Sequence, residues 1–278
     1  MNGSASSELV IEPGRTERNY WKDLWRYREL FYFLSWRDIL VRYKQTVFGV
    51  AWAVVRPFLT MVVFTIVFSR VARLHSDPSV PYPLLVMAGM LPWQFFASSL
   101  SESSNSLTLN SNLISKIYFP RLIVPASSVI TSFVDFTITL VLMAIMMAWY
   151  HFVPDWRLLC LPLFIAVSLG ASFGAGLWLA ALNVEYRDFR YIIPFVVQFG
   201  LYVSPVGFST SVIPLRWRLL YSLNPVVGVI DGFRWAIFRG HSVLWWPGLI
   251  VSMVVTVAMC ASGIWYFRKM ERTFADVI

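Results

Sequence analysis

The sequence predicts an all-α integral membrane protein with six transmembrane helices, and two observations carry that prediction. Hydrophobic residues make up 58% of the 278 residues and charged residues only 14%, which leaves too few charges to cover a water-soluble domain. Apolar runs also recur at the length of roughly 20 residues that a helix needs to cross a bilayer. We expect spans near residues 47–70, 82–103, 125–150, 158–182, 191–208 and 247–267.

Basic residues are divided unevenly between the two sides of the predicted membrane. With six spans both termini lie on one side, and fifteen Lys and Arg residues fall on that side, against seven on the other and Arg56 within a span. Cytosolic loops carry the excess of basic residues in membrane proteins, so both termini are expected in the cytosol. Residues 1–19 are then a flexible cytosolic N-terminus, because they lack the apolar core of a cleavable signal.

Residues 20–46 are predicted to form an amphipathic helix at the membrane interface, ahead of a single transmembrane domain over 47–278. Charged residues recur there near a 3.6-residue period, while aromatic and aliphatic residues fill another face. The helix suits either of two uses, a plain membrane anchor or a cytosolic gate. As a gate, it is expected to act through Arg37, Arg42 and Lys44.

The first cytosolic loop is expected at 104–124, where a Ser/Asn-rich stretch leads into KIYFPRLIVP. A short amphipathic helix is predicted within it, and Pro120 stops that helix. Its apolar and basic side chains are Leu113, Ile114, Lys116, Ile117, Tyr118, Phe119 and Arg121. An apolar knob of this kind needs a cover, which either the membrane interface or a cytosolic partner protein supplies.

Two charged residues fall at a similar depth inside predicted spans. Arg56 lies about nine residues into the first span and Asp135 about ten into the third, roughly 14 Å deep at 1.5 Å per residue. Because an unpaired charge at that depth is costly, we expect an Arg56–Asp135 ion pair. Two alternatives stay open: Arg56 faces an anionic substrate, or Arg56 pairs with Glu102 in place of Asp135.

The fourth span and the segment after the fifth carry marks of their own. Gly170 and Gly174 form a G-x-x-x-G pattern that favours the close approach of another helix. Over 205–238 we expect a re-entrant or interfacial pair of short helices on the outer side, because polar and helix-breaking residues make a lipid-facing helix too costly. The residues that mark this segment are Pro205, Asn224, Pro225, Asp231 and Arg234.

Motifs for energy-coupling chemistry are missing from the sequence. It contains no G-x-x-x-x-G-K-[ST], no G-x-G-x-x-G after a strand and no His/Cys cluster. We therefore expect neither an enzyme nor a metal site in this chain. Nucleic acid is a poor partner despite a net charge of +8, because the basic residues are spread between spans.

Five stretches resemble the permease subunits of ABC-2 type polysaccharide exporters, which move lipid-linked O-antigen, capsule or teichoic acid chains across the bacterial inner membrane. They occur in the family's order and cover the chain from about residue 20 to 240. The stretches are RYKQTVFGVAWAVVRP (42–57), PYPLLVMAGMLPWQFF (81–96), NLISKIYFPRLIVP (112–125), LNVEYRDFRYIIPF (182–195) and LNPVVGVIDGFRWAIF (223–238).

The resemblance implies a homodimeric, multi-pass inner-membrane permease bound to two copies of an ABC ATPase subunit, which holds the ATP and Mg. It also implies that the short helix at 113–121 is the coupling helix that contacts the ATPase. Lipid-linked polysaccharide is then the substrate, and an ABC-2 exporter of a small amphiphile, drug or simple lipid is the alternative. A secondary transporter fits less well, because no internal repeat or set of buried acids is visible.

Aromatic residues make up 17% of the chain, and sugar rings stack on the faces of such side chains. Most serve as lipid-belt or core residues. Some lie near span ends that are expected to face the dimer axis. We expect the glycan path to be lined by Phe48, Trp52, Trp93, Phe96, Tyr202 and Phe208.

Overall fold

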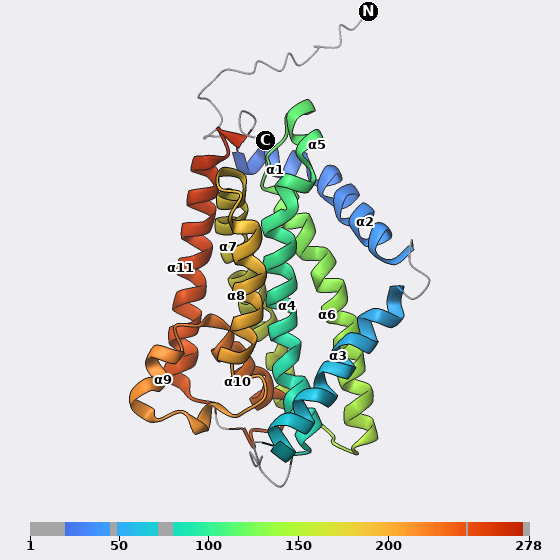
Figure 1. The fold of residues 1–278 in the computed structure, drawn as a ribbon, viewed down its shortest axis with the longest axis vertical. Coiled ribbons are helices and arrows are strands. Elements are labelled where there is room, and N and C mark those ends of the chain that lie inside the picture. Colours follow the sequence, from blue (N-terminus) through green and yellow to red (C-terminus); the bar gives the residue numbers. More distant parts are fainter. Residues whose placement is uncertain (1–19, 45–48, 72–79, 243, 275–278) are drawn as a thin grey trace, which may run out of the picture.

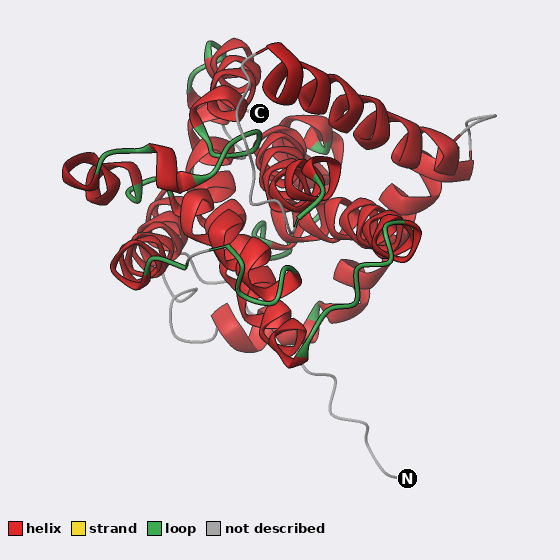
Figure 2. Ribbon diagram, turned by 90° about the horizontal axis from the view of Figure 1, so that it is seen from below, coloured by secondary structure: helices red, strands yellow, loops and turns green. Residues whose placement is uncertain are grey.

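The computed structural model describes residues 20–44, 49–71, 80–242 and 244–274. Within these ranges every regular element is a helix, and most of the long helices run side by side along the molecule (Figures 1 and 2). The all-α class that the sequence predicts is therefore confirmed.

Helix α4 (Tyr82–Leu109) forms the centre of the bundle, and 78% of its apolar window is buried. Its largest contacts are with one helix that precedes it in the chain and four that follow it, and these surround it in Figure 1. These neighbours are α3 (Gly49–Thr65), α6 (Ile123–Trp149), α7 (Leu161–Glu185), α8 (Phe189–Val203) and α10 (Pro225–Ile237). Helix α11 (Trp246–Met270) packs on α7 and α10.

Five helical segments of the described ranges are long and apolar enough to cross a bilayer, at 51–70, 82–109, 123–149, 156–185 and 246–270. The first includes the π-helical turn Ile66–Val71 and the fourth the 3₁₀ turn Trp156–Cys160. Helix α8 lies where the fifth span is predicted, but its 15 residues extend only about 22 Å at 1.5 Å per residue. Since a bilayer core is roughly 30 Å thick, the count of six spans stays a prediction.

The beginning of the described chain and the C-terminal end of α11 lie at the same end of the molecule (Figure 1). We call this the terminal end; it also carries α1 (Tyr20–Arg26), α2 (Arg28–Lys44) and α5 (Ser111–Lys116). The predicted helix over 20–46 is thus two helices that meet at Tyr27, and α2 packs along α6. The opposite end, which we call the far end, carries α9 (Leu215–Tyr221) and α10.

Helix α4 continues six residues beyond the predicted end of the second span, so the expected start of a loop at residue 104 is wrong. The polar stretch stays helical because its side chains bond to carbonyls one turn back. Ser104 and Asn105 donate to the carbonyl of Ser101 at 2.9 and 2.8 Å, and Ser106 donates to that of Ser103 at 2.7 Å.

The G-x-x-x-G pattern of α7 lies against α11, as its packing role predicts. A Cβ on Gly174 would lie 2.6 Å from the backbone nitrogen of Cys260, so no larger residue fits without moving a helix. At Gly170 the nearest atom is a methyl of Thr256 at 3.0 Å. Backbone contact between α7 and α11 therefore depends on Gly174 more than on Gly170.

Candidate functional site

Residues 111–122 comprise helix α5 and the connection from α5 to α6, and we call them together the α5–α6 loop. Its exposed tip lies at the terminal end. Ile117 and Tyr118 expose 55% and 52% of their surface. Ile114 and Phe119 are instead buried at 4% and 3% in the chain's own apolar core. The predicted apolar knob is therefore divided into a tip that is open to a partner and a root that packs inward.

The remaining predicted residues of the knob follow the same division. Lys116, the last residue of α5, is exposed beside the tip, and Leu113 is half-buried at the root. Arg121 is partly buried and begins the connection to α6. A positive charge thus accompanies the exposed apolar surface.

Arg121 and Glu271 join the root of the loop to the turn that follows α11. The backbone N–H of Arg121 donates to Oε1 of Glu271 at 2.7 Å, and the guanidinium of Arg121 donates to the backbone carbonyl of Glu271. The same guanidinium lies over the ring of Phe274, 6.0 Å from its centroid. Arg121 donates both hydrogen bonds, one from its backbone and one from its side chain, and together they fix the loop to the end of the last helix.

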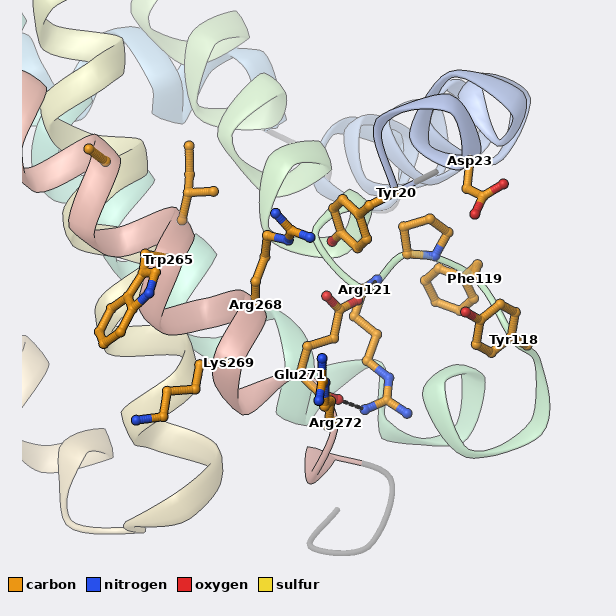
Figure 3. Close-up of a pocket in the computed structure, with 13 residues that line it drawn as sticks. Tyr20, Asp23, Tyr118, Phe119, Arg121, Trp265, Arg268, Lys269, Glu271 and Arg272 are labelled. Carbon is orange, nitrogen blue, oxygen red and sulfur yellow. Dashed lines mark hydrogen bonds between the residues drawn. The ribbon is translucent and has the colours of Figure 1, made fainter. Parts of the chain in front are cut away.

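The phenol of Tyr20 on helix α1 faces the same carboxylate (Figure 3), and its buried hydroxyl has no hydrogen-bond partner among the described residues. Burial raises the pKa of Glu271 above its ordinary value, while the Arg121 N–H, Tyr20 and the guanidiniums of Arg121 and Arg268 oppose the rise. Burial and the nearby carboxylate also raise the pKa of Tyr20. Arg268 lies over the Tyr20 ring, 4.6 Å from its centroid. We call Tyr20, Arg121, Arg268 and Glu271 the Glu271 junction.

A cavity of about 1040 Å³ opens beside the Glu271 junction. Ile264 and Trp265 of α11 form part of its apolar wall, and Asp23 and Lys269 lie among its charged residues (Figure 3). Sequence reasoning missed Tyr20 and Glu271 as functional candidates. The signal that could have found Glu271 is a single acid inside the basic run RKMER at 268–272.

Arg42 reaches from α2 to acids on two other helices. Its guanidinium lies 2.7 Å from Oδ2 of Asp135 on α6 and 2.5 Å from Oε1 of Glu102 on α4. The hydroxyl of Tyr43 donates to the second carboxylate oxygen of Asp135. We call Arg42, Tyr43, Glu102 and Asp135 the α2 charge cluster.

The predicted Arg56–Asp135 ion pair is wrong, because Arg42 occupies the carboxylate instead. The prediction placed residues 20–46 flat on the membrane surface, which kept Arg42 away from Asp135. In the structure α2 packs along α6 and carries Arg42 down to the third span. Glu102, the expected alternative partner for Arg56, belongs to the same cluster through Arg42.

Arg56 instead lines a cavity of about 690 Å³ that opens next to the α2 charge cluster. Residues of α2, α3, α4, α6 and α8 form its walls. Trp52 and Trp93 provide aromatic surface there, and Gln94 and Ser98 provide amide and hydroxyl groups. Such a lining suits a ligand that has both ring faces and many hydroxyls.

The other two predicted gate residues are placed differently from each other. Arg37 donates to Oδ1 of Asp38 at 2.7 Å and to Oδ1 of Asn110 at 2.8 Å, so it ties α2 to the α4–α5 joint. Lys44, the last residue of α2, is exposed. Arg37 and Arg42 thus attach α2 to the bundle, and Lys44 does not take part in that attachment.

The aromatic residues predicted for a glycan path are only partly accessible. Trp52 and Tyr202 expose 60% and 62% of their surface, whereas Trp93 exposes 5% and packs on Gly200 of α8. Phe96 is half-buried against Trp93 at a centroid distance of 5.8 Å.

Tyr202 continues into a line of aromatic rings toward the far end. It stacks on Phe64 at 6.4 Å between ring centroids, Phe64 contacts Phe68 at 5.5 Å, and Phe68 contacts Phe208 at 6.5 Å. This line joins α3 to the connection that follows α8. Phe48 lies outside the described residues.

Arg234 of α10 holds the irregular connection after α8 in place. Its side chain is buried, with 2% of the residue exposed, and it donates to the carbonyls of Val206 and Phe208 at 2.7 Å each. A third donation reaches the carbonyl of Leu85 on α4 at 3.3 Å. One guanidinium thereby satisfies two carbonyls of the connection, those of Val206 and Phe208, which lie outside any helix, and ties them to α4.

Two tyrosines satisfy further carbonyls of the same connection. The hydroxyl of Tyr82 on α4 donates to the carbonyl of Gly207, and the hydroxyl of Tyr221 on α9 donates to that of Val203, both at 2.6 Å. Broken backbone in a membrane protein needs such partners. The connection therefore packs against protein, and the re-entrant or interfacial placement of the segment at 205–238 stays a prediction.

The other residues predicted for this outer segment have structural partners as well. Asn224 donates to the hydroxyl of Ser204 at 3.0 Å, directly before α10 begins at Pro225. Asp231 accepts a hydrogen bond from Thr210 at 2.6 Å. Pro205 is buried in the connection itself.

Comparison with known proteins finds one matching family and several full-length relatives. The profile of the ABC-2 type transporter family matches residues 29–238. "O-antigen export system permease protein RfbA" of Myxococcus xanthus is 27% identical over 92% of this chain and 98% of its own length. A protein of the same description from Klebsiella pneumoniae is 26% identical over 90% and 95%. "Polysialic acid transport protein KpsM" of Escherichia coli is 22% identical over 74% and 80%.

Proposed function

The chain belongs to the ABC-2 type transporter family, and we propose that it is the permease subunit of an exporter that moves lipid-linked polysaccharide across the bacterial inner membrane. Relatives that match nearly the whole chain are described as O-antigen export permeases, which supports this substrate class. The observation that carries the proposal is the cavity lined by Trp52, Trp93, Gln94 and Ser98 together with Arg56. Its mixture of rings, hydroxyls and a cation matches a glycan with an anionic lipid linkage.

The permease takes its energy from a separate subunit in this proposal. The sequence holds no P-loop, so ATP and Mg are assigned to two copies of an ABC ATPase. The tip of the α5–α6 loop is the contact for that ATPase, because Ile117 and Tyr118 expose apolar surface beside Lys116. The terminal end is then the cytosolic end, in agreement with its excess of basic residues.

A second copy of the chain completes the pathway in this proposal. Arg56 on α3 and Gln198 on α8 are both exposed within apolar helices. A charged or amide side chain that faces lipid at depth is costly, so these side chains favour protein or water as their surroundings. A homodimer that joins at the α3 and α8 faces would enclose a conduit between the two copies, wide enough for a polymer.

The aromatic rings, Arg56 and the connection after α8 each have a part in transport in this proposal. Trp52 and Tyr202 offer exposed rings on which sugars stack, and Arg56 attracts the phosphate of the lipid linkage. The connection after α8, held by Arg234, closes the far end while the pathway is idle. ATP binding moves the α5–α6 loop, and rigid helices separate to open the conduit.

Deletion of the gene in its own bacterium tests this function. Lipid-linked polysaccharide should accumulate on the cytosolic face of the inner membrane and disappear from the cell surface, and the wild-type gene should restore it. A complementing Arg56→Gln variant should restore less surface glycan at equal protein level. Normal surface glycan in the deletion strain, with lost resistance to amphiphilic compounds, would favour the small-amphiphile exporter instead.

A further inference from the structure

We infer that Glu271 is a positioning residue that makes the α5–α6 loop, helix α1 and the end of helix α11 move as one body. The inference rests on the proposed function, in which the ATPase acts on the loop. It adds a route by which that movement reaches the transmembrane cavity. The route connects Arg121 of the predicted coupling helix with Arg42 of the predicted gate through Tyr20 and Glu271, which neither prediction includes.

The first step of the route is the contact between Glu271 and the backbone of the loop. The carboxylate accepts the N–H of Arg121 at 2.7 Å, three residues after the exposed Tyr118. Because a backbone group is held, displacement of the tip displaces Glu271 whatever side chains the tip carries. Arg121 also donates from its guanidinium to the backbone carbonyl of Glu271. Two hydrogen bonds between the same two residues restrict their relative motion more than one would.

The second step is the packing that makes the junction stiff. Phe119, Phe267 and Phe274 expose 3%, 0% and 0% of their surface in one apolar core. The rings of Phe267 and Phe274 lie edge to face with centroids 5.3 Å apart. A close-packed core transmits a displacement instead of absorbing it, so the loop root and the end of α11 shift together.

The third step leads from Glu271 to α1 and on to α2. Tyr20 is 5% exposed, its phenol faces the carboxylate of Glu271 (Figure 3), and its ring packs under Arg268, so it is held by packing and by the cation over its ring. Helix α1 passes directly into α2, which binds the bundle through the Arg42 contacts with Glu102 and Asp135. These residues line the transmembrane cavity, so a shift of α1 reaches the substrate side.

The test compares glycan exported per ATP hydrolysed in proteoliposomes that hold the permease with its copurified ABC ATPase. Glu271→Ala should lower this ratio about fivefold or more, which is the low end of measured coupling between sites. Glu271→Gln keeps an acceptor oxygen for the Arg121 N–H and should retain most of the ratio. The matched control is Glu185→Ala, which removes the exposed carboxylate of the last residue of α7.

The outcomes separate coupling from a structural role. A purely structural Glu271 lowers the amount of assembled complex but leaves the ratio per complex unchanged, and that result would overturn the inference. An equal loss in Glu185→Ala would overturn it as well. Wild-type complex that hydrolyses ATP and exports no glycan contradicts the proposed function instead, and this measurement precedes the variants.

Spin-label distances test the inference even if Glu271→Ala fails to assemble. Labels at Trp21 on α1 and Ile117 on the loop tip, both exposed, report whether the two elements move together. In a background without Cys160 and Cys260, their distance should be the same with and without ATP. In the Tyr20→Leu variant, which removes the ring that lies between Glu271 and Arg268, the distance should broaden or diverge, whereas in Glu271→Gln it should stay close to that of wild type. A wild-type distance that changes with nucleotide would contradict the inference.

Discussion

The guanidinium of Arg42 lies 2.7 Å from the carboxylate of Asp135, although 93 residues separate them in the chain. This ion pair fastens the helix that precedes the first span to the third span. The same guanidinium reaches Glu102 on the second span. The α2 charge cluster therefore sets how closely α2 lies against the bundle and how wide the mouth of the adjacent cavity is.

Arg42→Ala should destabilise the protein, because it leaves Asp135 and Glu102 without their shared cation. Fully buried pairs cost about 3–5 kcal/mol to break, but these side chains are about 30% exposed, so we expect about 1–3 kcal/mol. Asp135→Asn should show a smaller loss. Thermal unfolding in nanodiscs measures both, with Lys44→Ala as the control at the same helix end. Equal melting temperatures for Arg42→Ala and Lys44→Ala would contradict the role of the cluster.

Arg234→Lys should loosen the connection after α8 despite keeping the charge. One ammonium cannot replace the guanidinium that reaches the carbonyls of Val206, Phe208 and Leu85, and each carbonyl left unpaired costs about 1–3 kcal/mol. We expect a lower melting temperature and, in proteoliposomes, an ion conductance that wild type lacks. The exposed Arg216→Lys is the matched control. Unchanged conductance would remove the sealing role of this segment.

Glu271 should make the stability of the protein decrease as the pH rises above 4.5, the ordinary pKa of this group. Its pKa is raised by burial in the folded state, so folding favours the protonated form. The contribution of the group is present in full below its ordinary pKa of 4.5 and is lost as the pH rises through the raised value. Glu271→Gln should flatten this part of the profile of melting temperature against pH. A slope identical to that of wild type would contradict the raised pKa.

Gly174→Val should separate α7 from α11, because its side chain would meet the backbone of Met259 and Cys260. Overpacking of this kind costs about 1–3 kcal/mol. Gly170→Ala should cost less, since its nearest neighbour is the methyl of Thr256 and not backbone. The difference in melting temperature between the two variants measures the effect. A larger loss for Gly170→Ala would reverse our assignment of the close contact.

The sequence predicts most of the helix positions, because apolar runs of bilayer length leave few alternatives. The second span, predicted to begin at 82, begins there as α4. Its end is misplaced, since residues such as Ser104 and Ser106 turn their hydroxyls to the helix backbone and let a polar stretch stay helical. Composition describes a polar stretch but not where its hydroxyl groups bond.

Partners across the bundle are harder to predict than the elements. Their similar depth in the membrane favours Arg56 as the partner of Asp135. Because α2 packs along α6, however, Arg42 is the residue that reaches Asp135. The basic run RKMER around Glu271 marks this acid as unusual but does not name its partners, and only the fold brings Tyr20 and Arg121 to it. The outer segment is more predictable, since buried Arg234 needs several acceptors and an irregular connection supplies them.

Reconstitution of the purified chain tests the central claim most directly. Proteoliposomes with lipid-linked polysaccharide on the outer face should carry the glycan inward only when the chain is combined with its copurified ABC ATPase and ATP is supplied. The chain alone, and the complex with a P-loop variant of the ATPase, should carry none. Glycan movement by the chain alone, or a complete ATP-driven complex that moves small amphiphiles and leaves the glycan in place, would contradict the account.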